Sequence, residues 1–453
     1  MPKKTQIRGM MCAAAISLPA MLCNTAAHAA DAFTDALTGG KVSGNFRLRY
    51  EDVNVDPIAP ATAPIDATAL TIRSRLGYET APFYGFTAML EFEDTHTVLG
   101  EDDYAPETTQ TPAYAPIVDP QVTEINRAYI RYRGVPKLDM GYGRQRIILD
   151  NQRYIGSVAW RQDEQTFDAF TAKYDGIPNW SFYYAYIDRV NGIASIKPTY
   201  NFDLETSDNI FNISYSGFVL GKITAYGYFL DNQEPDTALR NVAPDVNALN
   251  PALRYQSNDT IGARFDGVYI LPTTMPLRLF YTAEYAQQEL TTPTDVEFDT
   301  DYSLFEAGVG YTTKFGMLSF KLAQETLGSD QEGTALRGFQ TPYATKHAFN
   351  GWVDMFLNTP DGGLQDRYAT VFADLPYGVK FTAMYHQYKE DKGPASGGGA
   401  RDIGDEWNAQ FVKSFGPNYT VGIKYGKYSR DDDYNVATNI DTSKFWVWGE
   451  LNF

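Results

Sequence analysis

Arginines recur at even spacings in three segments of this sequence, and they are its clearest candidates for chemistry. The three groups are Arg47 with Arg49, Arg73 with Arg75, and Arg127 with Arg131 and Arg133. Even spacings place side chains on one face of a β-strand, and in these segments the other parity is mostly apolar or aromatic. Each segment would present one guanidinium face, and guanidinium groups bind anions.

Acidic side chains lie between the second and third arginine groups. Glu91 and Glu93 share one parity of the segment that follows Arg75. Because neighbouring strands are about 4.8 Å apart, rows of opposite charge would lie side by side and orient a polar solute that passes them. Alternatively, these charges satisfy one another and only fill the interior.

Three further arginines are candidates for the same lining. Arg153 and Arg161 follow the third group along the chain. Arg144 has the parity of Met140, which is apolar, so it would need a β-bulge near Gly141 or Gly143 to reach the charged face.

Strands must position these charges, and alternation with a period of two recurs along the chain. After residue 22 no apolar run is long enough for a membrane-spanning helix. We expect eighteen strands, at residues 42–51, 70–79, 86–93, 122–133, 137–143, 167–174, 180–189, 209–215, 222–230, 261–266, 277–285, 305–311, 318–322, 364–373, 379–385, 407–411, 419–425 and 445–453.

The links between these strands alternate in length. Every link after an even-numbered strand is short and nearly all contain Gly or Pro, whereas most links after odd-numbered strands are long, up to residues 326–362. Short periplasmic turns and long extracellular loops are typical of outer-membrane proteins. The sequence therefore predicts an all-β fold, a transmembrane antiparallel up-and-down β-barrel of about 18 strands, with 16 or 20 if one pair is misassigned.

The N-terminal residues are typical of an export signal. Basic residues precede an apolar run at residues 10–22, and Ala27-His28-Ala29 fits a cleavage site. We expect residues 1–29 to be a signal peptide and residues 30–453 to be the barrel. Both cysteines fall within the signal, so the mature chain needs no disulfide or thiol chemistry.

Composition excludes several classes of function. The formal net charge of −18 is too acidic for a general nucleic-acid binder. The mature chain has three histidines, His96, His347 and His386, and neither an H-E-x-x-H nor a G-x-S-x-G motif. We therefore expect no enzyme, no cofactor and no metal. With 32 Tyr and 27 Phe and a negative mean hydropathy, the chain has the composition of a Gram-negative outer-membrane barrel.

Two longer stretches carry a specific resemblance. They read G-R-Q-R-I-I-L-D-N-Q-R-Y-I-G-S-V-A-W-R-Q-D-E-Q-T-F-D-A-F from Gly143 to Phe170 and F-Q-T-P-Y-A-T-K-H-A-F-N-G-W-V-D-M-F-L from Phe339 to Leu357. Both resemble the alginate-export family of outer-membrane β-barrel porins. The resemblance implies an 18-stranded monomer with a conduit for an anionic polysaccharide, lined by Arg and Lys, and with loops that fold into the lumen.

Carried onto this sequence, the resemblance implies pore groups and one inward loop. The pore groups are Arg47, Arg49, Arg127, Arg131, Arg144, Arg153 and Arg161. The segment Phe339 to Leu357 would be the inward loop, with Phe339, Thr341, Pro342, His347, Trp352 and Asp354 as its candidate residues.

The sequence also departs from a dedicated alginate exporter. Such an exporter is expected to have a long periplasmic turn that acts as a plug, and all eight turns expected here are short. Glutamates at lumen parity dilute the positive lining; they are Glu91, Glu93, Glu284, Glu306, Glu325 and Glu406. We therefore expect a porin of the outer membrane, in contact with its lipid and lipopolysaccharide, that passes small polar and anionic solutes such as acidic sugars. The alternatives are export of an alginate-like polyanionic exopolysaccharide and a structural or adhesive barrel with an occluded lumen.

Overall fold

The computed structural model describes residues 26–56, 64–100, 103–104, 114–193, 204–231, 257–272, 277–291, 296–333, 335–393, 399–432, 434 and 440–453. Most of the expected signal peptide, residues 1–25, lies outside this set. Residues 26–29 belong to helix α1, Ala26–Thr38, which the sequence analysis did not predict. This helix contacts the turn after β2 through an edge-to-face pair of Phe33 with Phe83.

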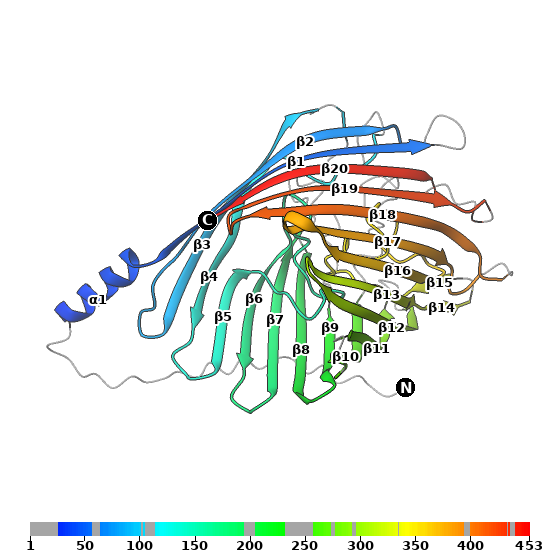
Figure 1. Ribbon diagram of the computed structural model, residues 1–453. Helices are drawn as coiled ribbons and strands as arrows, with labels where there is room; N and C mark the ends of the chain where they lie inside the picture. The colour runs from blue at the N-terminus through cyan, green and yellow to red at the C-terminus, as the bar shows by residue number, and fades with distance from the viewer. Residues whose placement is uncertain are drawn as a thin grey trace, which may run out of the picture.

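Eighteen antiparallel strands close into a barrel (Figure 1), as predicted, because β1 pairs with both β2 and β20. The strands are β1 Lys41–Asp56, β2 Ala67–Glu79, β3 Phe86–Leu99, β4 Val122–Tyr132, β5 Leu138–Gln145, β6 Thr166–Tyr174, β7 Trp180–Asn191, β8 Leu204–Phe218, β9 Gly221–Leu230, β10 Ser257–Ile270, β11 Leu277–Thr291, β12 Glu297–Thr313, β13 Gly316–Leu327, β16 Leu364–Asp374, β17 Val379–Lys389, β18 Asp402–Phe415, β19 Tyr419–Arg430 and β20 Asp441–Asn452. Each contains most or all of an expected segment.

Two short elements in the connections were not predicted. A separate hairpin, β14 Ser329–Glu332 and β15 Ala335–Gly338, lies in the long connection between β13 and β16. A single 3₁₀ turn, Pro376–Gly378, joins β16 to β17. Both are too short to show a period in the sequence.

The turns at one end of the barrel are as short as predicted. The longest join Glu79 to Phe86 and Ile270 to Leu277. Gly85 shows why glycine is needed in such a turn: its φ is +87°, and a Cβ there would lie 2.6 Å from the Cα of Gly134 in the next turn. Short turns force consecutive strands to pair, so the barrel follows the order of the sequence.

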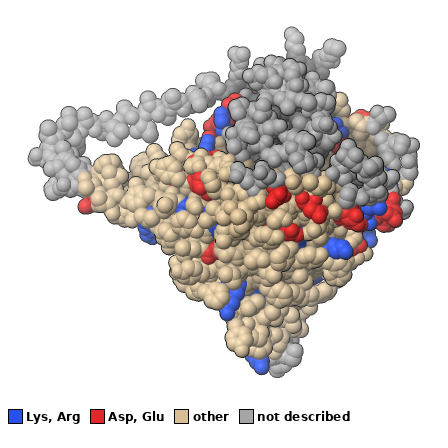
Figure 2. All heavy atoms as spheres, turned by 90° about the horizontal axis from the view of Figure 1, so that it is seen from above, with Lys and Arg blue, Asp and Glu red and all other residues tan. Residues whose placement is uncertain are grey.

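Apolar side chains cover the outside of the barrel at alternate positions. Leu48, Leu76, Phe92 and Ile130 are all exposed, while their charged neighbours point inward and are buried or half-buried. Figure 2 shows this surface as a largely uncharged band, with acidic side chains gathered along one edge. This alternation is that of an outer-membrane β-barrel, in which the apolar face contacts lipid.

Among the described residues no helix is both long and apolar enough to cross a bilayer.

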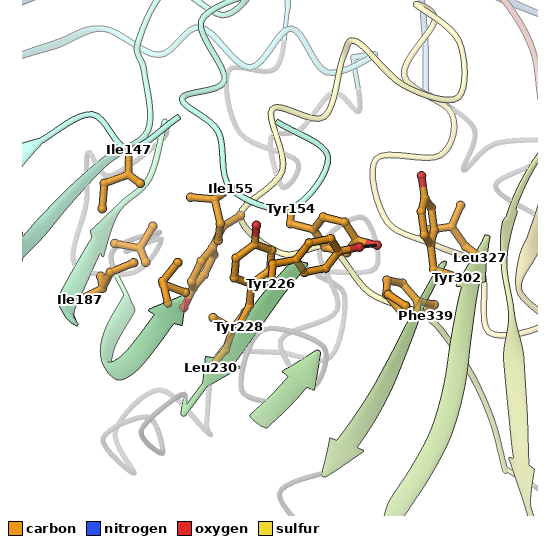
Figure 3. Close-up of a cluster of buried hydrophobic side chains, with 14 of the residues drawn as sticks. Ile147, Tyr154, Ile155, Ile187, Tyr226, Tyr228, Leu230, Tyr302, Leu327 and Phe339 are labelled. Carbon is orange, nitrogen blue, oxygen red and sulfur yellow. Dashed lines mark hydrogen bonds between the residues drawn. The ribbon is translucent and has the colours of Figure 1, made fainter. Parts of the chain in front are cut away.

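The lumen has two contrasting walls. Strands β1 to β4 carry charged side chains inward, whereas β7, β8, β9, β11 and β12 are among the strands that contribute apolar and aromatic side chains to a buried cluster (Figure 3). Two long extracellular connections contribute to the same cluster. We call residues 146–165, between β5 and β6, the first inward loop, and residues 339–363, between β15 and β16, the second inward loop.

Candidate functional site

Arg47 of β1 holds the first inward loop against the barrel wall. Its guanidinium is buried and donates hydrogen bonds to the backbone carbonyls of Ala159 at 3.0 Å and Trp160 at 2.9 Å, and also to the carbonyl of the next residue. Its Nε donates to Oε1 of Gln162 at 2.9 Å. The donors of Arg47 therefore bind the loop and are not available to a solute.

A third segment, residues 114–121 between β3 and β4, packs at the same place. Its Asp119 is ion-paired with Arg49 of β1 and accepts the backbone N–H of Gln162 at 2.9 Å. Burial alone would raise the pKa of Asp119, but the charges of Arg49 and Arg161 outweigh it and hold this pKa below its usual value. Asp119 is therefore ionised and connects the wall to the first inward loop.

The charges of β2 and β3 also pair with this loop. Arg75 Nε lies 2.5 Å from Glu93 Oε2, and its Nη1 lies 3.3 Å from Glu164 Oε2 in the loop. Arg146 Nη2 lies 2.5 Å from the other oxygen of Glu164. Most of the positive charge on this wall is therefore neutralised within the protein. This agrees with the alternative in the sequence analysis, in which the charges satisfy one another and fill the interior.

A β-bulge in β4 adds a polar side chain to the lumen. The register of β4 against β3 shifts between Glu91 and Phe92, so that Asn126 is the extra residue. Asn126 Nδ2 donates to Glu91 Oε1 at 2.9 Å, and Arg127 Nε donates to the same oxygen at 2.7 Å. Two consecutive residues of β4 therefore face inward, which a strict period of two does not predict.

Lys424 of β19 is enclosed by aromatic rings where the two inward loops meet the wall. Its Nζ lies 3.7 Å from the centre of the Trp160 ring and 4.3 Å from that of Trp352, and it donates to His347 Nε2 at 3.0 Å. Cation–π contacts of this kind stabilise a buried ammonium group. We call Lys424, His347, Asp354, Trp160 and Trp352 the lysine cluster.

Asp354 connects the lysine cluster to the first inward loop and to β20. Its Oδ1 lies 2.7 Å from His347 Nδ1, and its Oδ2 lies 2.8 Å from Arg161 Nη2 and 3.6 Å from Lys444 Nζ of β20. Burial lowers the pKa of His347 to about 3 despite this carboxylate. His347 is therefore neutral at pH 7, donating from Nδ1 to Asp354 and accepting at Nε2 from Lys424.

The second inward loop is fitted closely to the wall of β18. The backbone N–H of Val353 donates to Glu406 Oε1 at 2.9 Å, and Glu406 is buried. Gly351 has a φ of +89°, and a Cβ at this position would lie 2.3 Å from Glu406 Oε2. Only glycine fits there without displacing the carboxylate.

The two inward loops also bind each other. Gly156 N–H donates to Tyr343 O at 2.8 Å, and Thr345 N–H donates to Gln152 O at 3.0 Å. Tyr154, in the first loop, inserts among aromatic rings that include Tyr226 of β9, whose hydroxyl lies 3.1 Å from that of Tyr154 (Figure 3). The loops and the apolar wall thus form a packed core inside the barrel.

Other cations of the lumen remain partly open to water. Arg131 pairs with Asp139 at 3.3 Å with its side chain 25% exposed, and Lys321 pairs with Glu306 at 2.8 Å with its side chain 31% exposed. Arg127, Arg146 and Arg264 are half-buried, and each pairs with a glutamate. Arg278 and Lys380 also have lumen parity, and none of the described residues forms an ion pair with either.

The structure places most of the residues selected from the sequence inside the barrel. Arg47, Arg49, Arg73, Arg75, Glu91, Glu93, Arg153 and Arg161 are buried at the loops, and Arg127 and Arg131 are half-buried in the lumen. Four residues of the expected inward loop are buried: Phe339, Thr341, His347 and Trp352. Pro342 is half-buried, and so is Asp354 when its backbone is included, although its carboxylate is buried. Arg133 follows the last residue of β4, is half exposed and pairs with Asp139 at 2.8 Å beside the turn.

Arg144 does not line the lumen. The pairing of β5 with β4 and β6 has no register shift, so Arg144 keeps the outward parity of Tyr142. Its Nε lies 2.9 Å from Asp168 Oδ1 of β6, which has the same parity. The bulge that would have turned it inward is in β4 instead.

Sequence reasoning missed several residues that organise the site. Asp119, Gln162, Trp160 and Glu164 lie in connections, where no period indicates a direction. Lys424 lies in β19, but its partners come from both inward loops, so its surroundings could not be read from the alternation of its own strand. A cluster of tryptophans in one region of the sequence would have indicated an aromatic cage, and no such cluster exists in this chain.

The comparisons with known proteins agree with this geometry. The family model described as "Alginate export" matches residues 41–315. No curated protein matches the sequence. Among solved structures, the outer-membrane protein OpdK of Pseudomonas aeruginosa, crystallised with vanillate, is 13% identical, covers 92% of this chain and 99% of its own, and superposes with a TM-score of 0.63.

Two Acinetobacter baumannii structures are equally similar. OccAB1 is 12% identical over 92% of this chain and 97% of its own, and OccAB3 is 14% identical over 92% and 100%; both have a TM-score of 0.64. At these identities the likeness is one of fold, and that fold is the outer-membrane porin barrel.

Proposed function

Since this chain belongs to the alginate-export family and has the barrel of outer-membrane porins, we propose that it is a monomeric diffusion channel for small polar solutes with a preference for anions such as acidic sugars. Its location is the bacterial outer membrane. The preference for anions is the part that needs a test.

The partly exposed cations of the lumen support this preference. The arginines of β1 and β2 hold the inward loops and are buried, so they do not meet a solute in the arrangement of the structure. Arg131 and Lys321 are accessible, and no described residue neutralises Arg278 or Lys380. Positive groups that remain exposed along a lumen raise the local concentration of anions.

Two alternatives each have one supporting observation. The family description names alginate export, but the connections at the periplasmic end are all short, so no plug-sized turn is present there. The packing of two loops inside the barrel favours an occluded structural barrel. The occluded barrel predicts no conductance, which separates it from a diffusion channel.

Reversal potentials of the refolded barrel in a planar bilayer, measured in a salt gradient, test the proposal. We expect anion selectivity and block by an oligouronate added to one side. Both should weaken when Arg127 and Arg131 become Ser, because these cations line the lumen. Arg144→Ser is the matched control, since it removes a guanidinium that faces outward.

Each contrary result has a separate meaning. Cation selectivity, or indifference to the oligouronate, would contradict the preference for anions and leave a general porin. Absence of conductance would identify the occluded barrel.

A further inference from the structure

A polar groove lies on the outside of the barrel at the extracellular ends of β16 to β19. It has a volume of about 300 Å³, and its lining includes Arg367 of β16, Gln387 and Lys389 of β17, and Asp402 and Asp405 of β18. Their outward direction follows from parity: His386 and Tyr388, which alternate with Gln387 and Lys389, are buried inside. The groove is separate from the lumen, and its role does not depend on the transported solute.

Aromatic residues place this groove at the level of lipid headgroups. Tyr385 and Trp407 lie directly opposite each other on β17 and β18, one position closer to the membrane centre on the same face, with ring centres 4.3 Å apart. Tyrosine and tryptophan mark the boundary between the apolar band and the headgroups. The next outward row, Arg367, Gln387 and Asp405, is in register across three strands and therefore lies among the headgroups.

The charge on Arg367 lacks a partner within the described protein. Its side chain is exposed on the barrel wall. No described residue forms an ion pair or a hydrogen bond with its guanidinium. Lys389 has only a long contact, 3.7 Å, with Asp402. By contrast, Arg75 and Arg153 in the lumen each contact a carboxylate within 3 Å. A planar guanidinium beside an ammonium group is well suited to a phosphate.

Another part of the outer rim, about a quarter of the way around the barrel, carries only acidic side chains at this level. Asp259, Glu289 and Asp299 lie side by side on β10, β11 and β12 and are all exposed. Like charges directly opposite each other repel, and these carboxylates repel phosphates as well. Anionic headgroups should therefore avoid this acidic part of the rim, whereas the groove offers them the cations Arg367 and Lys389 beside its own carboxylates.

We infer that this groove binds a phosphate group of a lipopolysaccharide molecule in the outer leaflet, through Arg367 and Lys389. Gln387 can then donate or accept hydrogen bonds with the sugar that carries the phosphate, and Asp402 and Asp405 accept hydrogen bonds from its hydroxyl groups. Such a site would fix one lipid to this side of the barrel.

Native mass spectrometry of the refolded full barrel in detergent, with bis-phosphorylated lipid A and a chelator present, tests this site. We expect one lipid to remain bound, and the apparent affinity to fall at least tenfold in the double variant R367Q/K389Q. The matched control is K413Q/K427Q, which removes two cations from the outer face of β18 and β19, outside the groove. Refolding of each variant is checked by its heat-modifiable migration on a gel.

Four results would overturn the inference. If the wild type and R367Q/K389Q bound lipid A equally, the lipid would not bind at the groove. If K413Q/K427Q lost as much affinity as R367Q/K389Q, binding would depend on the general surface charge and not on this site. If dephosphorylated lipid A bound as tightly, the phosphate would not be the group recognised. If inorganic phosphate competed at equal concentration, the groove would be a site for free phosphate and not for a lipid.

Discussion

Replacing Asp354 by Asn should release the second inward loop from the barrel wall. The carboxylate is buried and contacts His347, Arg161 and Lys444. Arg161 would keep Glu51 as a partner at 3.1 Å, but Lys444 would have no described carboxylate within 4 Å. The variant therefore leaves positive charge uncompensated next to Lys424.

Removing one partner of a buried ion pair costs about 3–5 kcal/mol. If the lower figure applies to seating of the loop, the ratio of unseated to seated loop rises about 100-fold, since about 1.4 kcal/mol is a factor of ten. The strands keep their backbone hydrogen bonds, so the barrel itself should remain folded. We therefore expect a larger mean conductance and little change in thermal unfolding of the barrel.

Single-channel recording at fixed voltage measures this effect. Asp361→Asn is the matched control, because it makes the same substitution in the same loop at an exposed carboxylate, whose contact with Arg337 at 3.4 Å contributes little. If D354N conducts like the wild type or like D361N, the loop is not held by the lysine cluster and the reasoning is refuted.

Two further changes probe the seating of the same loop. Gly351→Ala should also raise conductance, because its Cβ would meet Glu406 Oε2 at 2.3 Å and the φ of +89° disfavours alanine; unchanged recordings would contradict the close fit. Lys346 gives a pH dependence: burial and the nearby Arg153 lower its pKa to about 7. Because this pKa is below the roughly 10.4 of a free lysine, the seated loop binds fewer protons and loses stability as pH falls from about 10 to about 7, with no further loss from this group below 7. Conductance should therefore be higher at pH 7 than at pH 9.5, and Lys346→Met should remove that difference. If conductance still depended on pH in this variant, a group other than Lys346 would be responsible.

Much of the fold could be predicted because its signals are local. The period of two in β1, with Leu48 outside and Arg47 and Arg49 inside, is set by neighbours in the chain and by the lipid that covers one face. The turn residues, such as Gly85, act within a few positions. Strand number, strand order and the direction of most side chains therefore follow from the sequence.

The candidate site could be predicted only in part. The second inward loop was expected from a resemblance and does lie inside the barrel. What the arginines do there was not accessible, because Arg47 and Gln162 are 115 residues apart and meet only after the barrel closes and the loop folds inward. The direction of Arg144 also depended on where a bulge formed, and the bulge is on the neighbouring strand.

The sequence by itself determined a barrel of eighteen strands with an apolar outside and a charged inside, because alternation and turn chemistry act over a few residues. The tertiary structure decided which of those charges remain available to a solute. It pairs Arg75 with Glu93 and Glu164, binds Arg47 to the first inward loop and leaves Arg131 and Lys321 partly exposed. The physical reason is that parity sets only the direction of a side chain, whereas its ion-pair partners are set by loops that arrive from distant parts of the chain.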